Sequence, residues 1–398
     1  MRILVIVNVF RPDLGGGVLF SDLCDGLAER GHEVTVKCAY SYYPEWTDKS
    51  GRNGWSIEDA TEGRLRVERH GIFIPRNPNS LPQRLVYEAS FFLSLARRLP
   101  EHGAFDLVLV FCPLVGAVAY GVLAARRSRA PLWLNVQDLS AQAAAAGGLA
   151  GAASGVLTWI QNALFRRAPV WSTISEPMVR ALSGIPGAPA DVHLLPNWLH
   201  GSLAEHVRLL AHKRTACHNP VRLLYSGNTG SKQDLLSFCA YLHAVDWPFE
   251  FRIHTDGARA GELRDHIASW ADPRFILAPL TDEAQLAQWL AWCDLYVITE
   301  RAGAGSSFIP SKLIPALSSG APILAVCDRG GPLGDEITRH GTGLLRTWTE
   351  LEQHGLSPAD FTELSTWSTN ALTRSAFYSR EEGIDRMDAF ARRTTGLT

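Results

Sequence analysis

The chain has 398 residues, which is enough for two domains that each bury a core. Lysine and arginine together number 38 and aspartate and glutamate 40, so the formal net charge is −2. This balance lacks the basic excess of nucleic-acid-binding proteins, and we expect no nucleic-acid partner. The seven cysteines are scattered without a C-x-x-C pair. Their spacing argues against a disulfide framework or a zinc ribbon and fits reduced thiols in a cytoplasmic protein.

Strands and helices alternate through the first half of the chain. Apolar, β-branched runs predict strands over 2–9 and 34–39, with a helix over 16–30 between them. This order is typical of a parallel, doubly wound sheet. We predict a long polar loop from 42 to about 64. The remaining elements predicted in this half are a helix over 81–98 and strands over 131–136, 171–175 and 192–195.

One uncharged run, 107–125, is long enough to cross a bilayer. It contains Pro113, Gly116 and Gly121, which favour a buried strand over 107–111 followed by a helix over 114–125. A second uncharged run, 139–165, precedes Arg166 and Arg167. It is either a packed helical hairpin, which we favour, or an amphipathic surface segment that could contact lipid.

Two polar clusters lie where parallel strands end. Gly15, Gly16 and Gly17 follow the first strand and precede a helix, which is typical of a phosphate-binding loop or of a plain tight turn. A dinucleotide fold is disfavoured because the G-x-G-x-x-G spacing is absent and no acid closes the second strand. Gln137 and Asp138 follow the strand over 131–136, and parallel sheets place their chemistry at such carboxyl ends.

After a polar stretch over 200–220, which we expect to be a linker, the strand–loop–helix pattern restarts. A strand over 221–225 leads into a glycine-bearing loop with Lys232 near the start of the next helix. The later elements predicted are strands over 251–254 and 275–277 and a helix over 283–292.

The stretch 294–326 contains the second glycine loop of this half. A buried strand over 295–299 precedes Gly303 and Gly305, and Ser311 is a good N-cap for a helix that ends at Gly320. Lys312 then lies at a helix start, where free amides and a full positive charge attract an anion. The alternative is an ordinary βαβ unit with a surface lysine, and this stretch alone does not separate the two.

Two doubly wound, Rossmann-like α/β domains with glycine loops facing a cleft indicate a GT-B glycosyltransferase. The chain resembles family 4 glycosyltransferases of the colanic-acid and exopolysaccharide type. The matching segments are Gly15-Gly16-Gly17, Tyr42-Tyr43-Pro44-Glu45-Trp46, Ile74-Pro75-Arg76, Val136-Gln137-Asp138, Ser172-Thr173-Ile174-Ser175, Pro196-Asn197-Trp198, Tyr225-Ser226-Gly227-Asn228, Lys232-Gln233 and Pro310-Ser311-Lys312-Leu313. The resemblance weakens after about residue 343.

The resemblance implies an acceptor-binding domain over 1–200, a nucleotide-sugar-binding domain over 201–375, and a C-terminal helix within 376–398 that returns to the first domain. By analogy, Lys232 and Lys312 would hold the donor diphosphate, and Gly15, Gly16 and Gly17 would close over it. Gln137 and Asp138 match positions near the reacting sugar. The residues expected to bind the donor are Gly227, Asn228, Asp256, Gly257, Leu280, Glu300, Arg301, Ser306, Ser307 and Ser311.

The chain departs from this family pattern at the ribose and beside the glycine loop. Asn228 stands where many relatives have arginine, and Pro315 and Ser307 stand where many have glutamates. Glu300, Arg301 and Ser306 are then the candidates to hold the ribose. These departures also leave open a catalytically impaired relative that binds nucleotide sugar or serves as an assembly partner.

The absence of any Asp-x-Asp motif predicts a metal-independent enzyme without a cofactor. The resemblance implies retention of anomeric configuration and a saccharide or lipid-linked acceptor in cell-surface polysaccharide biosynthesis. We expect a cytoplasmic protein, with peripheral contact to the inner membrane through the first domain, where Phe91 and Phe92 are further candidates for lipid contact. A GT-B epimerase would share the fold. A phosphorylase would need a pyridoxal-binding lysine motif, and an oxidoreductase lacks its fingerprint. The sequence does not identify the donor base, the sugar or the acceptor, although the resemblance hints at GDP-linked sugars.

Overall fold

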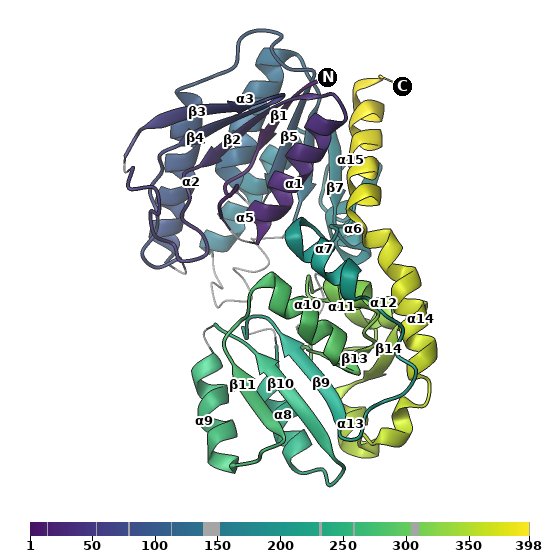
Figure 1. The fold of residues 1–398 in the computed structure, drawn as a ribbon. Helices are drawn as coiled ribbons and strands as arrows, with labels where there is room; N and C mark the ends of the chain where they lie inside the picture. The colour runs from purple at the N-terminus through teal and green to yellow at the C-terminus, as the bar shows by residue number, and fades with distance from the viewer. Residues whose placement is uncertain are drawn as a thin grey trace. The chain divides into compact units, whose positions relative to one another are not determined.

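The computed structural model describes residues 1–397 except 14, 53, 79, 113, 138–151, 231–232, 258 and 304–309, and it leaves the side chains of 152–157 undescribed. The chain divides into two compact units (Figure 1). The first comprises Met1–Asn197 and Gly383–Thr398, and the second comprises Trp198–Glu382. Each unit is described separately below.

The first unit is built on a sheet whose described strands have the order β3-β4-β2-β1-β5-β6-β7-β8. All neighbours pair in parallel except β3 and β4, which form an antiparallel pair at one edge. The bounds are β1 Arg2–Ile6, β2 Glu33–Ala39, β3 Ile57–Glu62, β4 Leu65–His70, β5 Leu107–Cys112, β6 Leu132–Val136, β7 Val170–Thr173 and β8 Val192–Leu194.

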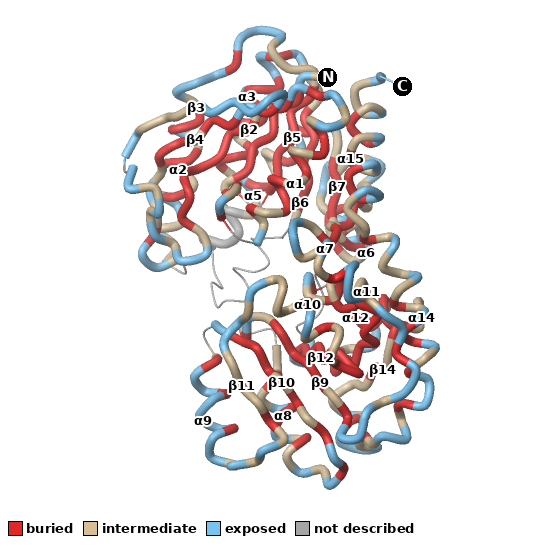
Figure 2. Tube along the Cα trace, in the orientation of Figure 1, coloured by how far each residue is buried: buried red, intermediate tan, exposed pale blue. Residues whose placement is uncertain are grey.

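The helices of the first unit are α1 Gly16–Glu29, α2 Leu81–Ala96, α3 Val115–Ser128, α5 Ala152–Phe165 and α6 Glu176–Ser183. Helix α2 packs on α3, and α3 packs on α5. Strand β5 is buried at every position, as an apolar run covered on both faces requires (Figure 2). The stretch 107–125 is therefore strand followed by helix, as predicted. Within the described residues, no helix combines the length and the apolarity needed to cross a membrane.

Three expectations for the first unit are wrong. The polar stretch expected to be a loop contains β3. This strand has no clear sequence signal, because it lies at a sheet edge and its outward side chains are polar. Strand β4 was not predicted either. Phe91 is fully buried in α2 and belongs to the core, so it is not a lipid contact. In the run 139–165, residues 139–151 lie outside the described residues, and α5 is described by its backbone and by the side chains from 158 onward.

The second unit contains a parallel sheet with the described order β11-β10-β9-β12-β13-β14. The strands are β9 Val221–Ser226, β10 Phe249–His254, β11 Phe275–Ala278, β12 Leu295–Thr299, β13 Ile323–Val326 and β14 Gly343–Arg346. The helices are α7 Gly201–Leu210, α8 Leu235–His243, α9 Ala260–Trp270, α10 Glu283–Trp292, α11 Leu313–Ser319, α12 Pro332–His340, α13 Trp348–His354 and α14 Leu364–Ser375. Two short 3-10 turns, Pro358–Phe361 and Ala376–Tyr378, complete the described elements.

Two expectations for the second unit need correction. The supposed linker contains α7, which packs on α10 and α11 through the buried Val207. Its short amphipathic pattern was hidden by the polar residues around it. Helix α11 begins after Lys312, which is itself the N-cap, rather than after Ser311. It ends at Gly320, whose φ of 77° fits the predicted glycine stop.

The final helix, α15 Arg380–Thr395, packs on the first unit. Its Phe390 ring lies 4.7 Å from the ring of Trp133 and 4.6 Å from that of His193. At its contact with α1, Gly26 leaves room for Ile384, whose side chain would overlap a Cβ at that position. Small and large side chains therefore interlock along this helix pair.

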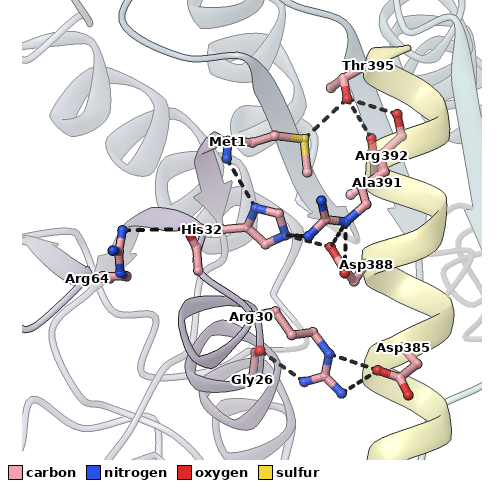
Figure 3. A network of polar contacts seen from close by, with 11 residues as sticks. Met1, Gly26, Arg30, His32, Arg64, Asp385, Asp388, Ala391, Arg392 and Thr395 are labelled. Carbon is pink, nitrogen blue, oxygen red and sulfur yellow. Dashed lines mark hydrogen bonds and ion pairs between the residues drawn. The ribbon is translucent and has the colours of Figure 1, made fainter. Parts of the chain in front are cut away.

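Polar contacts reinforce the same helix (Figure 3). The buried His32 ring donates from Nε2 to Asp388 Oδ1 at 2.5 Å and accepts at Nδ1 from the Met1 ammonium at 3.3 Å. Burial lowers the pKa of His32, which favours this neutral form. Arg392 Nε also donates to Asp388, at 3.1 Å, and Arg30 Nε donates to Asp385 Oδ1 at 2.9 Å. Helix α15 is thus a structural part of the first unit despite its place at the end of the chain.

We predict that Phe390→Ala destabilises the first unit by about 3–5 kcal/mol, because it removes a buried aromatic side chain and leaves a cavity against Trp133. Denaturant unfolding of the full chain measures this change. The control is Leu397→Ala, since that side chain is half exposed and its loss should cost no more than about 0.5 kcal/mol. Equal effects of the two substitutions would show that α15 does not contribute to the core.

Candidate functional site

The sheet of the second unit has a topological switch point between β9 and β12. The chain proceeds from β9 through β10 to β11 on one side, and then returns to place β12 on the other side of β9. Loops at the carboxyl ends of two such strands lead away in opposite directions, and open α/β sheets bind ligands there. The loop after β9 begins with Gly227 and Asn228, and the segment after β12 begins with Glu300 and leads to Lys312.

Lys312 and Gly227 come together at this switch point. A Cβ built on Gly227 would lie 2.9 Å from Lys312 Nζ, so the ammonium group rests against the glycine backbone. Nζ donates a hydrogen bond to the Tyr225 hydroxyl at 2.8 Å and lies 4.0 Å from the centre of the Tyr225 ring. Two segments 85 residues apart in sequence thus form one small site in which a cation lies directly against a glycine.

The environment of Lys312 makes its charge responsive to a ligand. Burial lowers the pKa of Lys312 to about 7, while the negative charge of Glu300 acts in the opposite direction. An ammonium that has lost much of its hydration gains more from a bound anion than an exposed one does. Lys312 is thus half-buried and hydrogen-bonded to Tyr225, rather than fully solvated.

Four other expected residues of the second unit form an adjoining cluster. Thr229 N donates to Asp256 O at 3.0 Å, which joins the loop after β9 to the loop after β10. A Cβ on Gly257 would lie 3.1 Å from Thr229 O and 3.6 Å from Asn228 Cβ. The backbone amide of Leu280, beyond β11, lies 3.4 Å from Asp256 Oδ2. Asn228, Asp256, Gly257 and Leu280 therefore line neighbouring loops at the carboxyl ends of β9, β10 and β11.

The remaining expected residues of this unit have varied surroundings. Glu300 is buried, and its carbonyl accepts from Trp348 Nε1 at 2.8 Å. Arg301 and Ser311 are exposed. Lys232, Ser306 and Ser307 lie outside the described residues, as does Asp138 of the first unit.

The glycine loop of the first unit is held by a carboxylate that the sequence analysis missed. Buried Asp13 accepts from Ser41 Oγ at 2.5 Å and from the amides of Tyr42 and Tyr43 at 3.0 and 3.1 Å. It therefore fixes the loop after β1 to the loop after β2. Gly17 packs against Asp13, since a Cβ there would lie 3.0 Å from Asp13 Cβ. A Pro-Asp pair before glycines is a turn signal that could have identified this residue.

Gly15 and Gly16 differ in what surrounds them. Gly15 has a φ of 64° and faces the Tyr43 ring, which lies 3.6 Å from the position of an added Cβ. A side chain at Gly16 would meet Phe20, 3.2 Å away. Close packing therefore favours a small residue at Gly16, whereas the left-handed φ favours glycine at Gly15.

The nitrogen and the oxygen of the Gln137 side-chain amide each form a hydrogen bond. Its Nε2 donates to Asn135 Oδ1 at 2.5 Å, and its Oε1 accepts from Asn197 Nδ2 at 2.9 Å. Asn135 in turn donates to Ser172 Oγ at 3.0 Å. These bonds fix Gln137 at the end of β6 and connect it with the end of the first unit, and they leave one N–H and one lone pair for a ligand.

We predict that Gly227→Ala costs about 1–3 kcal/mol in stability, because its φ of 139° strains any side chain and the new methyl group would displace Lys312. The variant should also bind inorganic diphosphate more weakly in calorimetry. The control is Gly261→Ala in α9, where a Cβ meets no atom within 4 Å. Unchanged stability and diphosphate affinity in both variants would contradict this account of Gly227.

Comparison with known proteins finds a matching domain and a similar curated protein. Residues 15–198 match the family model of the glycosyl transferase 4-like domain. WcaI of Escherichia coli (strain K12), which is named as a colanic acid biosynthesis glycosyl transferase, is 27% identical over 348 residues, covering 84% of this chain and 85% of the relative.

Solved structures match along the whole chain. The sucrose-phosphate synthase of Thermosynechococcus elongatus superposes with a TM-score of 0.69 at 14% identity, covering 100% of both chains. Anabaena Alr3699/HepE in complex with UDP superposes with a TM-score of 0.67 at 15% identity, covering 98% of this chain and 99% of the other. At these identities the likeness shows the fold. The expected resemblance is thereby confirmed: residues 15–198 match a glycosyl transferase 4-like domain, and the chain has the fold of GT-B glycosyltransferases.

Proposed function

We propose that the protein is a retaining glycosyltransferase that moves a sugar from a nucleotide-diphosphate sugar to a saccharide or lipid-linked acceptor in cell-surface polysaccharide biosynthesis. The observation that carries the proposal is the meeting of Lys312 with Gly227 at the switch point of the second sheet. A diphosphate carries enough charge to require a cation, and its oxygens need a backbone that they can approach closely. Lys312 would supply the cation, and the loop that begins at Gly227 would supply the backbone.

The donor would extend from this site across the adjoining loops. The loops that follow β9, β10 and β11 carry our candidates for binding the nucleoside, which are Asn228, Asp256, Gly257 and Leu280. Glu300, Arg301, Ser306, Ser307 and Ser311 follow β12 and are candidates for the ribose and the phosphates. The UDP complex of the structurally similar Alr3699/HepE supports a nucleotide in this fold.

The chemistry that we propose needs no metal. The diphosphate is the leaving group, so negative charge grows on it as the glycosidic bond to the nucleotide breaks. Lys312, with Lys232 as its proposed partner, would stabilise that charge more strongly in the transition state than in the ground state. Retention then follows from attack on the face that the leaving phosphate occupies, where that phosphate can accept the acceptor proton.

The first unit supplies the proposed acceptor side. Gly15, Gly16 and Gly17 would close over the diphosphate, and Gln137 and Asp138 would contact the reacting sugar. Because Gln137 is held between Asn135 and Asn197, its position is set before a ligand arrives. The name of WcaI supports a polysaccharide product.

We predict that Lys312→Ala lowers kcat/KM for the donor by about ten- to a hundredfold, because it removes a charged hydrogen-bond donor from the diphosphate. Part of the loss should appear in kcat, since the charge on the leaving group grows in the transition state. Transfer is measured in EDTA with a panel of UDP-, GDP-, ADP- and TDP-sugars, and NMR of the anomeric proton reports the product configuration.

The control for this experiment is Lys213→Ala, which removes an exposed lysine of the same unit and should leave turnover unchanged. Full activity of Lys312→Ala with the correct donor would refute the diphosphate site. Loss of wild-type activity in EDTA with recovery in Mg²⁺ would refute metal independence, and an inverted product would refute retention. Donor binding without transfer or hydrolysis would favour a non-catalytic binding protein.

We also propose that the protein works on the cytoplasmic face of the inner membrane and touches it through the first unit. Trp159 of α5 is 66% exposed, and Arg166 and Arg167 follow the helix on the surface. Further exposed apolar side chains are Leu85, Val86 and Leu93 of α2. Aromatic and aliphatic side chains beside arginines suit the boundary between acyl chains and anionic headgroups.

We predict that the wild-type protein floats with anionic liposomes at low salt and that Trp159→Glu reduces the bound fraction severalfold, because it replaces an apolar contact with a charge that anionic lipid repels. The control is Leu209→Glu in α7 of the second unit, where the side chain is as exposed as Trp159. Wild-type protein that stays wholly in the soluble fraction would rule out this mode of attachment.

A further inference from the structure

The Tyr225 hydroxyl both accepts and donates a hydrogen bond at the proposed donor site. The residue is buried near the carboxyl end of β9, two positions before Gly227. Its oxygen accepts a hydrogen bond from Lys312 Nζ at 2.8 Å, and its own O–H donates to the carbonyl of Asn228 at 3.0 Å. One phenol thus connects the lysine that precedes α11 with the loop that follows β9.

The direction of these bonds follows from the chemistry of the groups. Burial raises the pKa of Tyr225 well above its ordinary value, so the side chain stays a neutral phenol with a single proton. Because a carbonyl can only accept, that proton belongs to the bond with Asn228. The remaining lone pair faces Lys312, which can satisfy it as a donor. The hydroxyl therefore gives Lys312 an acceptor, which acts against the lowering of its pKa by burial.

The ring of Tyr225 restricts the lysine further. Lys312 Nζ lies 4.0 Å from the ring centre, within the range of a cation–π contact. A lysine side chain ordinarily loses considerable rotamer freedom when it binds a ligand. Here the hydroxyl and the ring face already hold the amine beside Gly227, so part of that loss occurs before the donor arrives.

We propose that Tyr225 is a positioning residue: its hydroxyl holds the Lys312 amine against the Gly227 backbone, so that the donor diphosphate meets a cationic group already in position. This inference rests on the proposed function, because it assigns Lys312 to the diphosphate. The role is distinct from that of a buried core tyrosine, since it acts through the charge and placement of another residue.

The role has a consequence for the dependence of activity on pH. The pKa of Lys312 in the free enzyme is about 7, so kcat/KM for the donor should fall as the pH rises through that value and the ammonium is lost. Without the Tyr225 oxygen, the ammonium loses an acceptor and its pKa falls further. The alkaline limb of the profile should then move to lower pH.

The test is Tyr225→Phe, which keeps the ring and removes only the hydroxyl. We expect kcat/KM for the donor to fall about tenfold near pH 7.5 and the alkaline limb to move to lower pH. Nucleoside diphosphate affinity, measured by calorimetry, should weaken in parallel. In a Lys312→Ala background the same substitution should have little further effect, because the two residues act as one unit.

The matched control is Tyr296→Phe on the neighbouring strand β12. Tyr296 is also buried, and its hydroxyl donates to Ser226 O at 2.7 Å, one residue before Gly227, so its removal perturbs the same region without removing the acceptor at Lys312. It should lower stability about as much as Tyr225→Phe and leave the pH limb in place. If the alkaline limb of the pH profile shifts equally in both variants, Tyr225 has only a structural role.

The outcomes separate this inference from the proposed function. If Lys312→Ala is impaired while Tyr225→Phe keeps the wild-type rate and pH profile, the positioning role is wrong and the diphosphate site stands. If Lys312→Ala and Tyr225→Phe both behave as wild type, the diphosphate site itself is wrong. An additive effect of the two substitutions in the double variant would also overturn the positioning role.

Discussion

The candidate site depends on the partial burial of one ammonium group. Lys312 gives up hydration to lie between the Tyr225 ring and the Gly227 backbone, and its pKa falls to about 7 as a result. A group with a lowered pKa binds fewer protons when folded than when unfolded, so it destabilises the free protein most below pH 7 and ceases to do so above about pH 10.5. Under the proposed function, a bound diphosphate would relieve this cost, and the stability lost in the free protein would be regained as affinity.

The topology of the sheet explains why this arrangement is possible. Strands β9 and β12 are neighbours although α8, β10, α9, β11 and α10 intervene in the chain. The reversal at β9 brings Gly227 and Lys312 to the same edge of the sheet. Tyr225 and Tyr296 belong to β9 and β12, which are buried and pair with each other. Rigid strands hold these side chains, while the loops after them carry the other candidate residues.

In the first unit, the candidate residues are also held in place by neighbouring side chains. Its glycine loop is fixed by the Asp13 carboxylate, and its Gln137 is fixed by Asn135 and Asn197. Helix α15 completes the core of this unit from the far end of the sequence, through Phe390 against Trp133 and through Asp388 against His32. Such a core depends on residues separated by more than 250 positions, so neither part of the chain encodes it alone.

The sequence by itself determined the α/β class, the glycine loops and the carboxyl-end positions of Gly227, Gln137 and Lys312, because strand and helix periods and turn residues are local signals. It also carried the family resemblance that the comparisons confirmed. It missed β3 and α7, whose polar residues mask short elements that tertiary contacts stabilise. Only the tertiary structure decided that Phe91 is core and that Tyr225 meets Lys312. The burial of Phe91 and the contact of Tyr225 with Lys312, 87 positions away, arise from the packing of distant segments. No local pattern in the sequence predicts them.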